Sequence, residues 1–128
     1  MFLERSPIAT LIANAATAQN CVGLSIKDVK KLINEKGYIT ESGVTKEENT
    51  YYITGEDNVA YRIYYFDDSN RCFLTALYLN DTTEDEHKEQ LTERGYLQFE
   101  DAYYKDDVKA IILYSEELKR HYLILVEK

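Results

Sequence analysis

The sequence predicts an α+β fold: an N-terminal helical hairpin, an antiparallel β-meander, a third helix and a second antiparallel β-meander. Two stretches with helical spacing of apolar residues each end at a glycine, Gly37 and Gly95. Each glycine is followed by short segments rich in β-branched and aromatic residues, separated by turn-forming residues. Residues 33–39 also return, conservatively altered, as residues 91–97. This echo predicts a helix–sheet unit used twice, as an imperfect α-β repeat.

The 128-residue chain fits a single domain, 1–128, with its own core. We expect residues 1–80 to form the first helix–sheet unit and residues 81–128 the second. No Pro/Gly-rich linker separates the two units. The sequence therefore predicts that their strands join in one continuous sheet.

Local signals predict the helices of the hairpin. In residues 6–18, a serine and a proline suit the N-cap and first turn, and apolar residues follow at helical spacing. Ser25 would cap the second helix, with Asp28 in the position that completes a capping box. Gly37 suits the C′ position that ends this helix.

The strands are predicted from runs of β-formers between turns. In the first unit they cover residues 51–54, 59–66 and 72–79, with weak pairing at 38–44. A capping box at Thr83–Glu86 starts the third helix, which runs to Arg94 and is closed by Gly95. Because this helix has a poor apolar face, we expect it to be mostly exposed. The strands of the second unit follow at 96–99, 102–104, 108–114 and 120–126.

The last predicted strand is apolar on both sides. Tyr122, Ile124 and Val126 alternate with Leu123 and Leu125, so the two sets point to opposite faces. Helices can cover one face of such a strand. The other face is left for a partner.

The charge of the chain narrows the classes of partner. A net charge of −8 argues against nucleic acid and against anionic membranes, because both repel an acidic surface. Residues 7–18 are too short and too polar to span a bilayer, so we expect no membrane span. Localisation is open: extracytoplasmic if Met1 replaces a longer leader, cytoplasmic if Met1 is the native start.

No motif for catalysis, for metal binding or for a cofactor occurs, so none of these sites is predicted. His87 and His121 lack further ligands at short spacing, and we interpret His87 as a packing residue. Cys21 and Cys72 are the only cysteines. We favour buried free thiols over a disulfide, because cysteine often packs as a small hydrophobe.

Tyrosine is the unusual component, with twelve copies against four phenylalanines and no tryptophan. One interpretation is cross-strand packing on a half-wet sheet. The other is a protein-binding face, because tyrosine offers a large rigid contact area and a hydroxyl group. The candidates for an outward, partner-binding role are Tyr52, Tyr64, Tyr104 and Tyr114.

A short segment resembles a known group of proteins. Residues 23–33, Gly-Leu-Ser-Ile-Lys-Asp-Val-Lys-Lys-Leu-Ile, look like the helix opening of small secreted helix–helix–sheet proteins, and residues 64–72 are similar to their strand–turn–strand. These are the outer-membrane assembly lipoprotein BamE and the β-lactamase inhibitory protein. The resemblance implies a protein-binding role without chemistry and an extracytoplasmic origin.

Together these features predict a non-catalytic protein-recognition module that binds a protein through a tyrosine-rich sheet face. The candidate partners are a basic protein and a second copy of the chain, and no nucleic acid. The alternative is a small-ligand-binding protein or enzyme with a pocket between helices and sheet, using His87 and nearby carboxylates. A further alternative, an acidic mimic of nucleic acid, requires carboxylates regularly spaced along one face.

Overall fold

The computed structural model describes residues 20–128 of the chain. The described elements, in chain order, are α2 (Ile26–Lys36), β1 (Ser42–Val44), β2 (Tyr51–Glu56), β3 (Ala60–Phe66), β4 (Cys72–Leu79), α3 (Glu84–Glu93), β5 (Leu97–Phe99), β6 (Ala102–Lys105), β7 (Val108–Ser115) and β8 (Arg120–Glu127). The α+β class is confirmed. The predicted order of three helices is not matched, since these residues hold two helices. The first helix, expected to begin at Ser6–Pro7 and to stop near residues 20–23, lies outside the described residues apart from its expected end.

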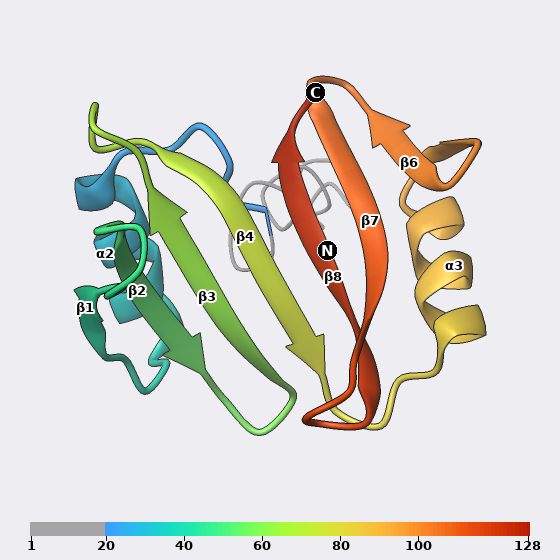
Figure 1. The fold of residues 1–128 in the computed structure, drawn as a ribbon, viewed down its shortest axis with the longest axis horizontal. Coiled ribbons are helices and arrows are strands. Elements are labelled where there is room, and N and C mark those ends of the chain that lie inside the picture. The colour runs from blue at the N-terminus through green and yellow to red at the C-terminus, as the bar shows by residue number, and fades with distance from the viewer. Residues whose placement is uncertain (1–19) are drawn as a thin grey trace, which may run out of the picture.

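All eight strands form one antiparallel sheet, in the order β1-β2-β3-β4-β8-β7-β6-β5. Each helix precedes a group of four strands, and the two groups meet where β4 pairs with β8. Figure 1 shows the helices at opposite flanks of the sheet, α2 beside β1 and β2 and α3 beside β6. The predicted continuous sheet is therefore present, and its two edges are the three-residue strands β1 and β5.

The ends of α2 follow from local chemistry. The Ser25 hydroxyl accepts a hydrogen bond from the Asp28 amide at 3.1 Å and so caps the first turn. Gly37 adopts the left-handed region at φ +72, where a side chain would be strained, and its amide donates back to the last turn. Both features match the sequence prediction.

The helix α3 begins with the predicted capping box. The Thr83 hydroxyl accepts from the Glu86 amide at 3.2 Å, and the Glu86 carboxylate accepts from the Thr83 amide at 2.9 Å. Gly95 follows the helix at φ +92. Only His87 and Leu91 of this helix are buried, as its weak apolar pattern predicted.

Both helices pack on the same side of the sheet, which we call the helix face. Buried residues of α2, Val29 and Ile33, share a cluster with Ile53, Tyr64 and Phe66. Leu91 of α3 belongs to a second cluster of buried strand residues. The strand members of the second cluster are Ala60, Leu77, Leu79, Tyr103, Val108, Ala110, Leu123 and Leu125.

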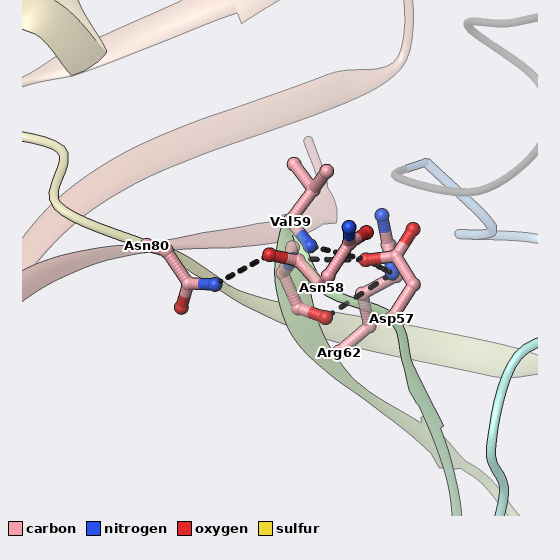
Figure 2. A network of polar contacts seen from close by, with 6 residues as sticks. Asp57, Asn58, Val59, Arg62 and Asn80 are labelled. Carbon is pink, nitrogen blue, oxygen red and sulfur yellow. Dashed lines mark hydrogen bonds and ion pairs between the residues drawn. The ribbon is translucent and has the colours of Figure 1, made fainter.

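The helix face also buries one arginine, Arg62 of β3, beside the turn that joins β2 to β3. Arg62 is 3% exposed, and its Nη1 donates to the Asp57 carboxylate at 3.3 Å. The same Asp57 oxygen accepts from the amides of Val59 and Ala60, as Figure 2 shows for this network. Burial raises the pKa of Asp57, but the two amides and the Arg62 charge outweigh it and hold this pKa below its ordinary value. The network fixes the turn.

Candidate functional site

The side of the sheet opposite the helices is the candidate site, and we call it the open face. Residues paired across neighbouring antiparallel strands point to the same side. The pairs Tyr52–Tyr65, Tyr61–Tyr78 and Tyr104–Lys109 therefore lie opposite the helix face. The six tyrosines of the open face are Tyr52, Tyr61, Tyr65, Tyr78, Tyr104 and Tyr122.

The tyrosines of the open face contact one another across the strands. The rings of Tyr78 and Tyr122 stack with centroids 4.6 Å apart, at the seam between β4 and β8. Tyr61 lies beside Tyr78 at 6.1 Å, which extends the row into β3. These contacts hold the rings in fixed positions, because offset or tilted aromatic pairs at such distances attract one another. The open face therefore presents ordered rings.

Aliphatic side chains fill the spaces between these rings. They are half-buried or exposed rather than buried, and comprise Ile63, Leu74, Ile111, Leu113, Ile124 and Val126. At the β5 edge, Leu97 is 76% exposed and Phe99 is 64% exposed. Ile39, which pairs with Glu56 beyond the opposite edge, is 71% exposed. Large apolar side chains are therefore exposed at both edges of the open face.

Charged side chains lie beside several rings of the open face. Glu56 pairs with Tyr61 across β2 and β3, and Glu41 lies opposite Thr54. Burial raises the pKa of Tyr61, and the carboxylates of Glu41 and Glu56 raise it further. On the other half, the Lys109 ammonium lies 5.9 Å from the ring centre of Tyr104. Such a contact is a cation–π interaction.

Arg120 provides the second positive charge of that half. Its guanidinium lies 5.6 Å from the ring centre of Tyr78 and donates to the Asn80 side chain at 3.4 Å. Asn80 in turn donates to the Asn58 carbonyl at 2.9 Å, as seen in Figure 2. This chain of contacts fixes the arginine at the end of the seam.

The structure places the four predicted tyrosines in different surroundings. Tyr52 and Tyr104 lie half-buried on the open face, as expected. The outward placement of Tyr64 is wrong: it is 1% exposed and packs under α2, because its alternation puts it on the helix face. Tyr114 is 49% exposed, but it pairs with His121 on the side of the helix face rather than on the open face.

Four tyrosines of the open face were missed by sequence reasoning, namely Tyr61, Tyr65, Tyr78 and Tyr122. A signal for one of them was present, because Tyr122 shares a strand face with Ile124 and Val126. For the others, alternation within a single strand gives two equally aromatic faces. Only the pairing with neighbouring strands shows which of the two faces the helices cover.

The alternative site between helices and sheet was expected to use His87. This histidine is 0% exposed, and burial lowers its pKa below the ordinary value. It lines neither of two open depressions on the surface of residues 20–128. One, of about 540 Å³, lies by the start of α2, and the other, of about 660 Å³, lies by the start of α3.

The cysteines and the acidic residues offer no second site among the described residues. Cys21 and Cys72 are buried and are not joined in a disulfide, as the sequence favoured, and burial raises the pKa of each. Within residues 20–128, no group of three or more His, Cys, Asp or Glu side chains could hold a metal ion. In the same part of the chain, neither helix is long and apolar enough to cross a membrane.

In comparisons with known proteins, no family model, no curated protein and no solved structure matches this chain.

Proposed function

We propose that this chain is a non-catalytic recognition module whose open face binds a protein. The observation that supports this most directly is the set of six tyrosines on a sheet face opposite both described helices. Tyrosine in ordered cross-strand contacts gives large contact area at little cost in conformational entropy. The resemblance of residues 23–33 to the helix opening of BamE and the β-lactamase inhibitory protein implies the same role.

We further propose that the two helix–sheet units are an imperfect repeat that doubles the width of this face. Each unit consists of a helix followed by four strands. Counted inward from its own edge of the sheet, each unit has its four strands in chain order, β1 to β4 from one edge and β5 to β8 from the other. Gly37 and Gly95 each follow a helix, and both glycines have a positive φ. A single unit would present four strands, whereas two units joined at β4 and β8 present eight.

The proposed function is tested by removing rings from the open face and following the capture of a partner. The variant Tyr52→Ala with Tyr104→Ala removes one half-buried ring from each half. Each change should cost about 1 kcal/mol or less of folding free energy. Because domains are stable by about 5–15 kcal/mol, the variant should remain folded by circular dichroism. It should lose most of the partner that the immobilised wild-type chain captures from the source organism.

The matched control is Tyr114→Ala, which removes a tyrosine of similar or greater exposure outside the open face. This control should capture the partner like the wild type. Equal capture by all three chains would contradict the proposal. Loss of capture with Tyr114→Ala alone would move the binding surface to the end of the helix face.

A further inference from the structure

Helix α3 is held on the sheet by very few of its side chains. Within Glu84–Glu93, only His87 and Leu91 are buried, at 0% and 3% exposure. His87 is the one buried residue in the first half of the helix, and Leu91 lies in the second half. The acidic first turn, Glu84–Glu86, is exposed. Contact between the sheet and the N-terminal half of α3 therefore depends on the side chain of His87.

The site of His87 suits a neutral ring and not a charged one. Both ring nitrogens are buried, and neither has a hydrogen-bond partner among the described residues. A neutral imidazole carries one N–H donor and a protonated imidazole carries two. A buried charge without a partner costs far more free energy than a buried neutral group. Protonation of His87 therefore requires that water reach the ring.

The titratable groups around His87 do not offset the cost of charging its ring. Of the strands beside α3, β5 has no titratable residue, β6 brings Tyr103 and β8 brings His121. The helix itself brings Glu86, whose exposed carboxylate is bound to the Thr83 amide. Burial lowers the pKa of His87, and the His121 ring lowers it further. The nearby His121 carbonyl and Glu86 raise this pKa, but not enough to outweigh burial.

An open depression of about 660 Å³ adjoins the N-terminal half of α3. Its lining includes Glu84, at the start of the helix, and His121 of β8. Tyr114 of β7 also lines it, with its ring centre 4.9 Å from that of His121. The charged residues of the lining are two acids and two bases, Asp81, Glu84, Lys119 and Arg120. Water therefore reaches the neighbours of His87 in sequence and in space, while His87 itself stays covered.

Both ends of α3 are tethered, so one half of the helix can lift without the helix leaving the sheet. Before the helix, the Asn80 amide donates to the Val59 carbonyl at 3.0 Å. After it, the Lys105 ammonium donates to the Arg94 carbonyl at 2.7 Å. The second tether and the buried Leu91 both act on the C-terminal half. The N-terminal half, which holds His87, is the less firmly held of the two.

We propose that α3 is a pH-controlled cover of the helix face: protonation of His87 lifts the N-terminal half of the helix from β8, and deprotonation returns it. This device goes beyond the proposed function, because it acts on the opposite side of the sheet. A pH switch needs an element with two positions and a buried histidine that biases them. The first half of α3 supplies the element, and His87 supplies the bias.

The size of the effect follows from proton linkage. In the lifted helix His87 is in water and its pKa is the ordinary value of 6.5, whereas burial in the docked helix holds the pKa lower. Lifting therefore becomes more favourable as the pH falls through 6.5, by about tenfold for each further pH unit. Between about pH 7.5 and about pH 5.0 we expect an increase of up to about thirtyfold. His87 and His121 are the only histidines of the chain, so few other side chains titrate in this interval.

The test is hydrogen–deuterium exchange of the full-length chain at about pH 7.5 and about pH 5.0, corrected for the intrinsic effect of pH on exchange. Amides in the first half of α3, such as that of His87, which donates to the Thr83 carbonyl at 3.0 Å, exchange when this half lifts. In the wild type, their protection should fall by about ten- to thirtyfold at the lower pH. Lifting exposes little surface, so this exchange should be unchanged in about 1 M urea. Exchange of β3 by global unfolding should accelerate by about fivefold or more in the same urea.

Two variants remove the titrating ring. His87→Leu places an apolar side chain in the site, and His87→Gln places a polar side chain that cannot be protonated. In each, the protection of α3 should be the same at both pH values, whatever its absolute level. The matched control, His121→Gln, removes the other histidine and should keep the pH response of α3.

Four results would overturn the proposal. The first is equal protection of α3 at both pH values in the wild type, and the second is a pH response that persists in His87→Gln. The third is loss of the response in His121→Gln, which would make His121 the titrating group. The fourth is exchange of α3 that accelerates in urea as much as that of β3, because α3 would then open only when the whole domain unfolds.

Discussion

The buried arginine of the helix face gives the sharpest stability prediction. Replacing Asp57 by alanine removes the carboxylate that accepts hydrogen bonds from Val59, Ala60 and Arg62 (Figure 2). Arg62 then stays buried, at 3% exposure, without its counter-charge. An uncompensated buried charge is one of the few causes of large destabilisation by a single substitution.

The size of the stability loss depends on the contacts that Arg62 retains when Asp57 is removed. Removing one partner of a buried ion pair costs about 3–5 kcal/mol. The Asp57 side chain is 32% exposed, however, and Arg62 Nη1 retains the Ala60 carbonyl at 3.3 Å. Its guanidinium also keeps the Tyr38 ring, 4.2 Å from the ring centre. We therefore expect Asp57→Ala to lower the free energy of unfolding by about 2–3 kcal/mol.

The turn between β3 and β4 supplies a matched control. Asp67 accepts backbone hydrogen bonds from Ser69 at 2.9 Å and from Arg71 at 3.1 Å, as Asp57 does in its own turn. Ser69 and Arg71 are both exposed, so Asp67→Ala leaves no buried charge behind and should cost only about 1 kcal/mol. Urea unfolding followed by circular dichroism measures both. Equal losses in the two variants would show that the buried charge contributes nothing.

Three further predictions concern buried groups. A methyl group at Gly55 would lie 3.1 Å from Tyr38 Cδ2. Gly55→Ala should therefore lower the urea midpoint by an amount equivalent to about 1–3 kcal/mol of unfolding free energy. An unchanged midpoint would show that the Tyr38 ring moves aside at no cost. Because burial lowers the pKa of His87, the unfolded chain binds its proton more readily, and stability should fall as the pH drops below about 6.5. His87→Leu should remove this part of the loss, measured by urea unfolding at two pH values; the same pH dependence in both chains would refute it. Burial raises the pKa of Cys21 to about 12 and raises that of Cys72, so a thiol reagent at neutral pH should label both cysteines only after unfolding, and rapid labelling of the native chain would contradict this.

Features determined by neighbouring residues could be predicted from the sequence. The caps at Ser25 and Thr83 and the left-handed Gly37 depend on contacts within a few residues, and all are present as expected. Strand β4 was predicted with its observed bounds, because turn residues flank it on both sides. Because these interactions join residues a few positions apart, the sequence alone predicts them.

The facing of the tyrosines depends on contacts between distant residues and could not be predicted in full. On β3, Arg62 and Tyr64 share one face, while Tyr61 and Tyr65 share the other. A charged residue ordinarily marks the wet face of a strand. Here Arg62 is buried beside Asp57, so its charge does not identify the open face, and Tyr64, which shares a face with Arg62, is buried as well. The partner that buries the arginine lies in the preceding turn.

The pairing of β4 with β8 has a consequence for how the chain folds. Every other strand pair in the sheet is a local hairpin or close neighbour, which can form on a microsecond timescale. Pairing Leu74–Leu77 with Leu123–Val126 closes a long loop of the chain. The conformational entropy of that loop is lost before the contacts between the two strands form. We therefore expect two preformed ribbons to dock in the rate-limiting step. If the chain is cut after Asn80 and the two fragments are separated, β4 and β8 become unpaired edge strands. We therefore expect the two fragments to reassemble when they are mixed.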